Sequence, residues 1–212
     1  MNNVRNLNEG LNVLNKPEKQ LTVTELETEK NIAANKAITD MMFPNESWIN
    51  IDNIKLDYKK IPAGVTGILV AESNLPKNKQ EEEDFLKEVK SAIILQKHGA
   101  CVTLIPRIRR KDGKGFQAGP DAIVNGVLYE FKEVTGGISK IGDRFKDSRK
   151  QGNNVYIRVE NLSLTKSKVV RYLARYISMP TYQGGFEGNI IFTFGADNGE
   201  KIYFFKIKDL KK

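Results

Sequence analysis

The chain has 212 residues, which suffices for one sizeable hydrophobic core or for a domain of about 130 residues with an extension. One cysteine, Cys101, and one histidine, His98, exclude an intramolecular disulfide, a cysteine-rich zinc site, a histidine-rich metal cage and a ribonuclease mechanism based on two histidines. The net charge of +8 lies in residues 80–212, because residues 1–79 carry ten basic and ten acidic side chains, and this excess favours a polyanionic partner.

Residues 1–79 are expected to form a smaller N-terminal region of unknown role. The opening segment MNNVRNLNEGLNVLN lacks the apolar stretch of a secretory signal, and no run of eighteen apolar residues that could span a membrane occurs in the chain. The pattern predicts a helix over residues 22–42, with Thr24 as its N-cap, and weak strands within 49–58 and 61–73. The polar segment 73–80 is predicted to be a linker, so we place a domain boundary after residue 79.

Residues 80–212 are predicted to form an α/β (α+β) domain with a central mixed β-sheet flanked by helices. Apolar residues at helical spacing predict a helix over 81–99, and CVTLIP predicts a short buried strand. A basic loop over 107–119 and a hairpin around Asn125-Gly126 follow. The remaining elements are a helix from about Ser139 to Gln151, a strand in NVYIRVE, a helix in SLTKSKVVRYLARYIS, and an antiparallel pair in NIIFTFG and KIYFFKIK.

The hairpin GPDAIVNGVLYEFK brings two acidic residues together. A two-residue Asn125-Gly126 turn places Asp121 opposite Glu130, with Lys132 pointing to the same face. Like charges at facing positions destabilise a sheet by roughly 0.2–1 kcal/mol. A divalent cation between the two carboxylates would remove this conflict, with Mg²⁺ favoured and Mn²⁺ or Zn²⁺ as alternatives. The plainer alternative is a solvated hairpin face on which Asp121 caps the turn at Gly119-Pro120.

Further polar residues are expected to join this hairpin in one cleft. Glu88 on the preceding helix could supply a third metal ligand, and Lys140, Arg144, Asp147 and Gln151 share one face of the following helix. Lys132 would orient the attacking water or stabilise charge that develops on phosphate. Cationic residues in the basic loop and the following helix are predicted to contact nucleic-acid phosphates: Arg107, Arg109, Arg110, Lys111, Lys114, Lys140 and Arg144.

These residues resemble the PD-(D/E)xK nuclease signature, with Pro120-Asp121, eight intervening residues, and then Glu130-Phe131-Lys132. The predicted element order is also similar to the αβββαβ core of that family. The segment from Glu88 to Glu160 resembles more closely the toxin domains at the C-termini of contact-dependent growth-inhibition (CdiA-type) proteins. The shared features are a helix Glu eleven residues before a Gly, then Pro-Asp-Ala, Asn-Gly, Glu-Phe-Lys, and a basic helix that ends in Gln before an apolar strand.

The resemblance implies an endoribonuclease that cleaves tRNA and that is delivered into the cytoplasm of a competing bacterium, where a cognate immunity protein neutralises it. It also implies that Asp121, Glu130 and Lys132 are active-site residues, together with Glu88 and Gln151, and that Asp121, Glu130 and Glu88 are the metal ligands. Such domains normally end a long delivery protein. Here only residues 1–79 precede the domain, so the chain is expected to be an excised fragment or a stand-alone protein from a phage or other mobile element.

Three other interpretations remain open at this point. Some toxins of similar appearance are metal-independent ribonucleases, and catalysis would then fall to Lys132, Thr135, Arg144 and Ser148, with the RNA 2′-hydroxyl as nucleophile. The same acids and metal would also serve a DNA nuclease of the restriction or repair type. The third interpretation is a non-catalytic module of a mobile element that binds nucleic acid or protein. The sequence does not indicate an oligomeric state.

Overall fold

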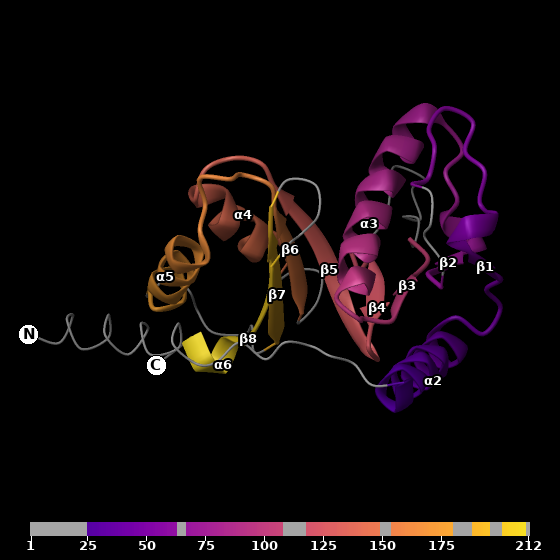
Figure 1. Ribbon diagram of the computed structural model, residues 1–212, viewed down its shortest axis with the longest axis horizontal. Coiled ribbons are helices and arrows are strands. Elements are labelled where there is room, and N and C mark those ends of the chain that lie inside the picture. Colours follow the sequence, from indigo (N-terminus) through magenta and orange to yellow (C-terminus); the bar gives the residue numbers. More distant parts are fainter. Residues whose placement is uncertain are drawn as a thin grey trace, which may run out of the picture. The chain divides into compact units, whose positions relative to one another are not determined.

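The computed structural model describes residues 25–62, 67–107, 118–148, 154–179, 188–195 and 201–210. The chain divides into two compact units, one of which ends at Phe131 while the other begins at Lys132 (Figure 1). Each unit contains a mixed β-sheet and helices, which confirms the predicted fold class. No helix in the described part of the chain is long and apolar enough to cross a membrane.

The first unit builds its sheet from neighbouring segments of the chain. The pairs β1–β2, β3–β4 and β4–β5 are antiparallel, whereas β2–β3 is parallel. Strand β5 continues past the point at which the two units divide. The elements are α2 (Glu25–Met42), β1 (Trp48–Asn50), the 3₁₀ turn η1 (Ile51–Asn53), β2 (Leu69–Ala71), η2 (Glu72–Asn74), α3 (Lys79–Lys97), β3 (Val102–Leu104), β4 (Ala122–Val124) and β5 (Val127–Val134).

Helix α3 shows why this sequence forms a helix at this place. The side chain of Asn78 accepts a hydrogen bond from the backbone N–H of Glu81 at 3.0 Å and so caps the first turn. Phe85, Val89 and other apolar residues at helical spacing are buried, and Gly99 ends the helix with a left-handed φ of 80°. The helix predicted over residues 81–99 is therefore confirmed to within two residues at each end.

The weak strands predicted before α3 are shorter than their sequence patterns. The segment 49–58 forms a strand only as far as Asn50, because Ile51 is buried and begins a 3₁₀ turn. In the segment 61–73, the described residues form a strand at Leu69–Ala71. These short strands reflect tertiary burial that alternation along the sequence does not indicate.

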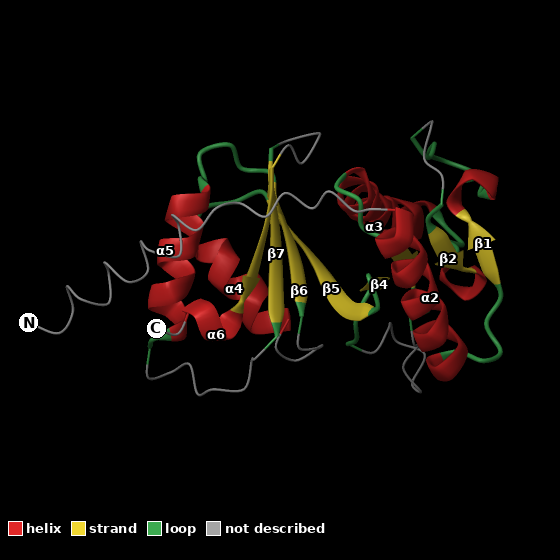
Figure 2. Cartoon of the chain, turned by 60° about the horizontal axis from the view of Figure 1, so that its bottom comes forward, coloured by secondary structure: helices red, strands yellow, loops and turns green. Residues whose placement is uncertain are grey.

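The second unit places its helices on one side of its sheet (Figure 2). Apolar residues of that sheet face and of the helices form one core, which includes Phe145, Ile157, Leu173 and Phe192. The predicted antiparallel pair at the end of the chain is confirmed as β7–β8, and β6 pairs in parallel with β7. The elements are α4 (Ser139–Ser148), β6 (Val155–Val159), α5 (Lys166–Ile177), β7 (Asn189–Phe194), β8 (Lys201–Lys206) and α6 (Ile207–Leu210).

Candidate active site

The hairpin between β4 and β5 has the predicted turn and register. Asn125 and Gly126 have φ values of 50° and 75°, the left-handed pair that a type I′ turn requires. Asn125 Oδ1 also accepts a hydrogen bond from Cys101 N at 2.7 Å, which anchors the turn to the neighbouring segment. The facing residues are Val124 and Val127, Ile123 and Leu128, and Ala122 and Tyr129, as the sequence predicts.

Asp121 directly precedes β4 and is held to β5 by two hydrogen bonds. Its backbone N–H donates to the carbonyl oxygen of Tyr129 at 2.9 Å, and its Oδ2 accepts from the backbone N–H of Phe131 at 2.7 Å. A hydrogen bond from a backbone N–H to an ionised carboxylate is charge-assisted and stronger than a neutral one. The facing strand therefore stabilises the negative charge of Asp121 directly, and this offsets part of the repulsion expected between the two acids.

Glu130 lies in the middle of β5 and its residue surface is only 3% exposed. Its neighbours Tyr129 and Phe131 are buried as well, so both faces of β5 are covered at this point. Side chains alternate along a strand, and Lys132, which is half-buried, therefore leaves β5 on the same side as Glu130. Because a carboxylate is costly to remove from water, Glu130 does not fit the alternative of an ordinary solvated hairpin face.

Glu88 and Arg107 form an ion pair. Glu88 is buried on α3, and its Oε1 contacts the guanidinium Nη2 of Arg107, which follows β3. The sequence assigned these residues separately, one to the metal and the other to phosphate. In the structure each already has a partner of opposite charge, and removal of either one would leave an uncompensated charge behind.

The available oxygen donors fit one kind of metal better than the others. Within the described residues, no group of three or more His, Cys, Asp or Glu side chains could hold a metal ion. Because Glu88 contacts Arg107, the remaining predicted donors are the carboxylates of Asp121 and Glu130. Two carboxylates suit Mg²⁺, which completes its shell with water and phosphate oxygens, better than Zn²⁺, which prefers histidine and cysteine ligands.

The predicted residues of α4 lie in the second unit. Lys140 and Arg144 are exposed; Lys140 Nζ lies 3.2 Å from a carboxyl oxygen of Asp143, and Arg144 Nε donates to the carbonyl of Glu133 at 3.3 Å. Ser148, a candidate for a metal-free mechanism, is fully buried and donates to the carbonyl of Arg144 at 2.7 Å. The exposed cations therefore remain candidates for phosphate contact, whereas the Ser148 hydroxyl is enclosed.

Several predicted residues lie outside the described part of the chain. They are Gln151 at the end of the basic helix, and Arg109, Arg110, Lys111 and Lys114 in the basic loop. Their roles in catalysis and in phosphate binding stay predictions.

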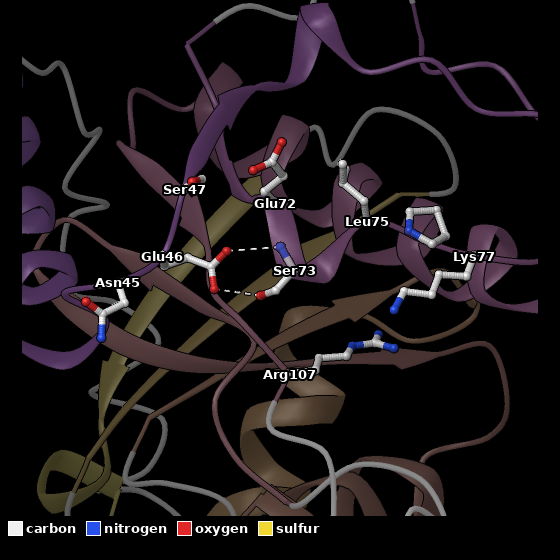
Figure 3. A pocket seen from close by; sticks show the side chains of 9 residues that line it. Asn45, Glu46, Ser47, Glu72, Ser73, Leu75, Lys77 and Arg107 are labelled. Carbon is white, nitrogen blue, oxygen red and sulfur yellow. Dashed lines mark hydrogen bonds between the residues drawn. The ribbon is translucent and has the colours of Figure 1, made fainter.

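A pocket of about 680 Å³ lies beside Arg107 (Figure 3). Glu46 and Ser73 both line this pocket. The carboxylate of Glu46 accepts hydrogen bonds from the backbone N–H of Ser73 at 3.0 Å and from the Ser73 hydroxyl at 2.7 Å. Acidic and basic side chains both line the pocket, so its charge favours no single class of ligand. The lining residues are Asn45, Glu46, Ser47, Glu72, Ser73, Leu75, Pro76, Lys77 and Arg107, and the hairpin acids are not among them.

The sequence interpretation missed a buried ionic cluster on β6. Arg158 is 2% exposed, and its guanidinium contacts the carboxylates of Glu160 and, at 3.3 Å, Glu133. On the same side of β6, the hydroxyl of Tyr156 hydrogen-bonds to Thr193 Oγ1 at 2.7 Å, and burial raises the pKa of Tyr156 far above its ordinary value. The alternation of polar and apolar residues in VYIRV was the available signal, because the apolar positions belong to the core.

The sequence interpretation also missed Asn35, a buried polar residue of α2 that holds the hairpin. Its Oδ1 accepts a hydrogen bond from Gly126 N at 2.7 Å. Its amide nitrogen lies 3.2 Å from both Cys101 O and Thr103 Oγ1, and 3.3 Å from Ile123 O. One side chain thus joins three segments of the first unit. A lone Asn in a helix carries no sequence signal for such a role.

Comparison with known proteins identifies part of the chain. Residues 118–195 match the model of the contact-dependent growth inhibition CdiA C-terminal domain, which confirms the resemblance read from the hairpin. The matched segment contains Asp121, Glu130 and Lys132, whereas Glu88 and Arg107 precede it. No curated protein and no solved structure matches the chain. The match shows that this segment, which is less than half of the chain, is similar to the toxin domain of contact-dependent growth inhibition proteins.

Proposed function

We propose, on the premise that residues 118–195 form a growth-inhibition toxin domain, that this protein cleaves phosphodiester bonds in RNA, most specifically in tRNA. One observation carries the proposal. The Asn-Gly turn sets a register that brings Asp121 and Glu130 to the same end of the hairpin, and both acids lie inside the matched segment. The toxin acts in the cytoplasm of a target cell, and a cognate immunity protein protects the producing cell.

The proposed chemistry assigns a distinct task to each hairpin residue. Asp121 is oriented by the N–H of Phe131, whereas Glu130 is buried, so a cation that joins the two carboxylates must displace the groups that cover Glu130. Asp121 and Glu130 would hold Mg²⁺, which would supply Lewis-acid polarisation of the phosphodiester and activation of water. Lys132, on the same side of β5 as Glu130, provides a positive charge for the developing charge on phosphate.

A metal-free mechanism is the second candidate, and two observations favour it. One oxygen of Asp121 already accepts a hydrogen bond from the backbone, and the described residues contain no group of three metal-binding side chains. In this mechanism the hairpin acids are structural, and Lys132 with Thr135 and Arg144 acts on the 2′-hydroxyl of RNA. Ser148 is not part of this set, because its hydroxyl is buried.

Cleavage assays with three hairpin variants test the proposal. The protein is incubated with total tRNA and with plasmid DNA, each with Mg²⁺ and with EDTA. Asp121→Asn, Glu130→Gln and Lys132→Met are each expected to lower the rate of tRNA cleavage by about 100-fold or more. The two acid variants would weaken the binding of the cation, and Lys132→Met removes a positive charge at the reacting phosphate. Asp143→Asn is the matched control, since Asp143 is an exposed acid on α4.

Each outcome separates the candidates. Cleavage of tRNA that EDTA abolishes supports the metal site, whereas cleavage that survives EDTA and the Asp121→Asn change supports the metal-free mechanism. Cleavage of DNA alone assigns the same acids to a DNA nuclease. Folded protein that cleaves neither substrate contradicts the proposal and favours a non-catalytic binding module.

A further inference from the structure

Helix α5 carries four basic residues and no acidic residue between Lys166 and Ile177. Its buried side, formed by Val169, Val170, Leu173 and Ile177, packs into the core of the second unit. Surface helices usually mix both signs of charge, because Glu–Lys pairs one turn apart stabilise the helix. Helix α5 therefore lacks the Glu–Lys ion pairs that usually stabilise a surface helix.

Three of these cations form a row on the exposed side of the helix. Lys168, Arg171 and Arg175 are exposed and are spaced three and four residues apart, so they lie along one face. We call this row the α5 ridge. With a rise of about 1.5 Å per residue, its Cα atoms span about 10 Å. The fourth cation, Lys166, is directed elsewhere, because its Nζ lies 4.1 Å from the ring centroid of Tyr203.

The α5 ridge lacks acidic partners within the described part of the chain. Lys168 Nζ donates to the carbonyl of Ser163 at 3.0 Å, and neither Arg171 nor Arg175 forms an ion pair there. Exposed lysines elsewhere do have partners. Examples are Lys36 with Asp40 at 2.7 Å and Lys87 with Asp84 at 2.8 Å.

The position of Lys168 also opposes the stability of α5, whereas Arg175 lies in the last turn, where the helix dipole favours a cation. Lys168 lies in the first turn, where the positive end of the helix dipole disfavours a cation, and the first turn contains no acid. Like charges one turn apart, as between Arg171 and Arg175, disfavour the helix as well. A polyanion along this face would offset both costs.

We propose that the α5 ridge binds the phosphate backbone of the RNA substrate at a distance in sequence from the hairpin acids. The inference rests on the proposed function and extends it, because these residues were not among the predicted phosphate contacts. Arginine pairs with phosphate through two parallel N–H donors, and lysine adds a point charge. Contacts of this kind position the substrate without reading its bases.

The salt dependence of tRNA binding tests the α5 ridge. Binding is measured by fluorescence anisotropy in EDTA, with the Asp121→Asn, Lys132→Met variant of the 212-residue chain so that cleavage does not interfere. Adding Lys168→Gln, Arg171→Gln and Arg175→Gln should reduce the slope of log K against log salt by about 2, at about 0.7 per lost contact. The affinity near 0.1 M salt should fall about tenfold or more.

A charge-matched variant controls for the loss of net charge. Lys36→Gln, Lys87→Gln and Lys97→Gln remove the same three charges from exposed positions on other helices. This variant should keep at least most of the parental slope. Circular dichroism should show the same helix content in both triple variants, because the substituted side chains are exposed and glutamine is a good helix former.

Equal slopes for the two triple variants would overturn the α5 ridge as a phosphate contact. Binding of polyglutamate, which mimics an acidic protein surface, is measured as well. If the ridge variant kept the parental salt slope for tRNA but bound polyglutamate more weakly, the proposal would be overturned and the ridge assigned to an acidic protein partner. A duplex DNA of similar length is measured in parallel, and loss confined to that duplex contradicts an RNA role. Ridge-dependent tRNA binding without cleavage by the native chain would refute the proposed activity but not the ridge.

Discussion

Arg158 illustrates how a single residue can depend on partners distant in sequence. Its guanidinium is nearly removed from solvent, between Glu133 of β5 and Glu160 at the end of β6. Desolvation of the Arg158 guanidinium is expensive, and it is offset only while the two partly exposed acids stay paired with it. The role of Arg158 is therefore to compensate two acids, one of which adjoins Lys132 in the sequence.

Replacing Arg158 should have a large effect on stability. Arg158→Met is expected to lower the free energy of unfolding by about 3–5 kcal/mol, because Glu133 and Glu160 would lose their common cation. Urea denaturation measures the change. Arg171→Met, at an exposed position, should stay within about 0.5 kcal/mol of the native chain.

Adding Glu133→Gln and Glu160→Gln to Arg158→Met should restore part of the lost stability, since the stranded negative charges are removed. If Arg158→Met and Arg171→Met were equally mild, the ionic cluster would contribute nothing to the fold.

At the scale of elements, the hairpin depends on helix α2. Gly126 has a left-handed φ of 75°, and a Cβ built there would lie 2.7 Å from the Cβ of Ala34. Asn35, the next residue of α2, bonds the backbone of the same turn. The Asn-Gly turn therefore meets two requirements, one from the backbone of the turn and the other from the close approach of a helix.

Gly126→Ala should destabilise the protein by about 2 kcal/mol or more, since left-handed strain costs about 1–2 kcal/mol and the contact with Ala34 adds to it. In a double-mutant cycle, Ala34→Gly should recover only the contact part of this loss. Gly137→Ala is the matched control, because its Cβ would meet nothing within 4 Å. A Gly126→Ala loss no larger than that of Gly137→Ala would contradict the close packing of α2 on the turn.

At the scale of the whole molecule, residues before the predicted boundary at 79 are part of the first unit. Strand β2 pairs in parallel with β3, and the buried Glu82 accepts hydrogen bonds from the N–H groups of Asp57 and Tyr58 at 2.7 and 2.9 Å. The two compact units divide after Phe131. An independent domain formed by residues 1–79 stays a prediction.

Hydrogen exchange on a chain that begins at Gln80 tests this organisation. Without α2 and β2, the amides of β3 and of the Asn125-Gly126 hairpin should exchange at least about tenfold faster, because their partners are missing. The amides of β7 should keep their protection, since that strand belongs to the second unit. Asn35→Ala in the full chain serves as the comparison, and unchanged exchange in both variants would contradict the role assigned to α2.

Features of the fold that depend on local physics could be predicted from the sequence. Helix boundaries follow from caps and apolar spacing, as in α3, and the Asn125-Gly126 turn fixes the pairing of its strands, because few residues tolerate two successive left-handed conformations. The hairpin motif also indicated the resemblance that the family model matches over residues 118–195. The residues that carry each of these signals are close to one another in the sequence.

Which charged side chains contact one another depends on the tertiary packing. The Glu88–Arg107 pair, the Arg158 cluster and the Asn35 contacts each join segments that are separate in the sequence. Their formation depends on how strands and helices stack, and the sequence pattern reports which residues are polar but not which ones are buried together. For the same reason, the acids of the candidate site could be identified from the sequence, whereas their surroundings could not.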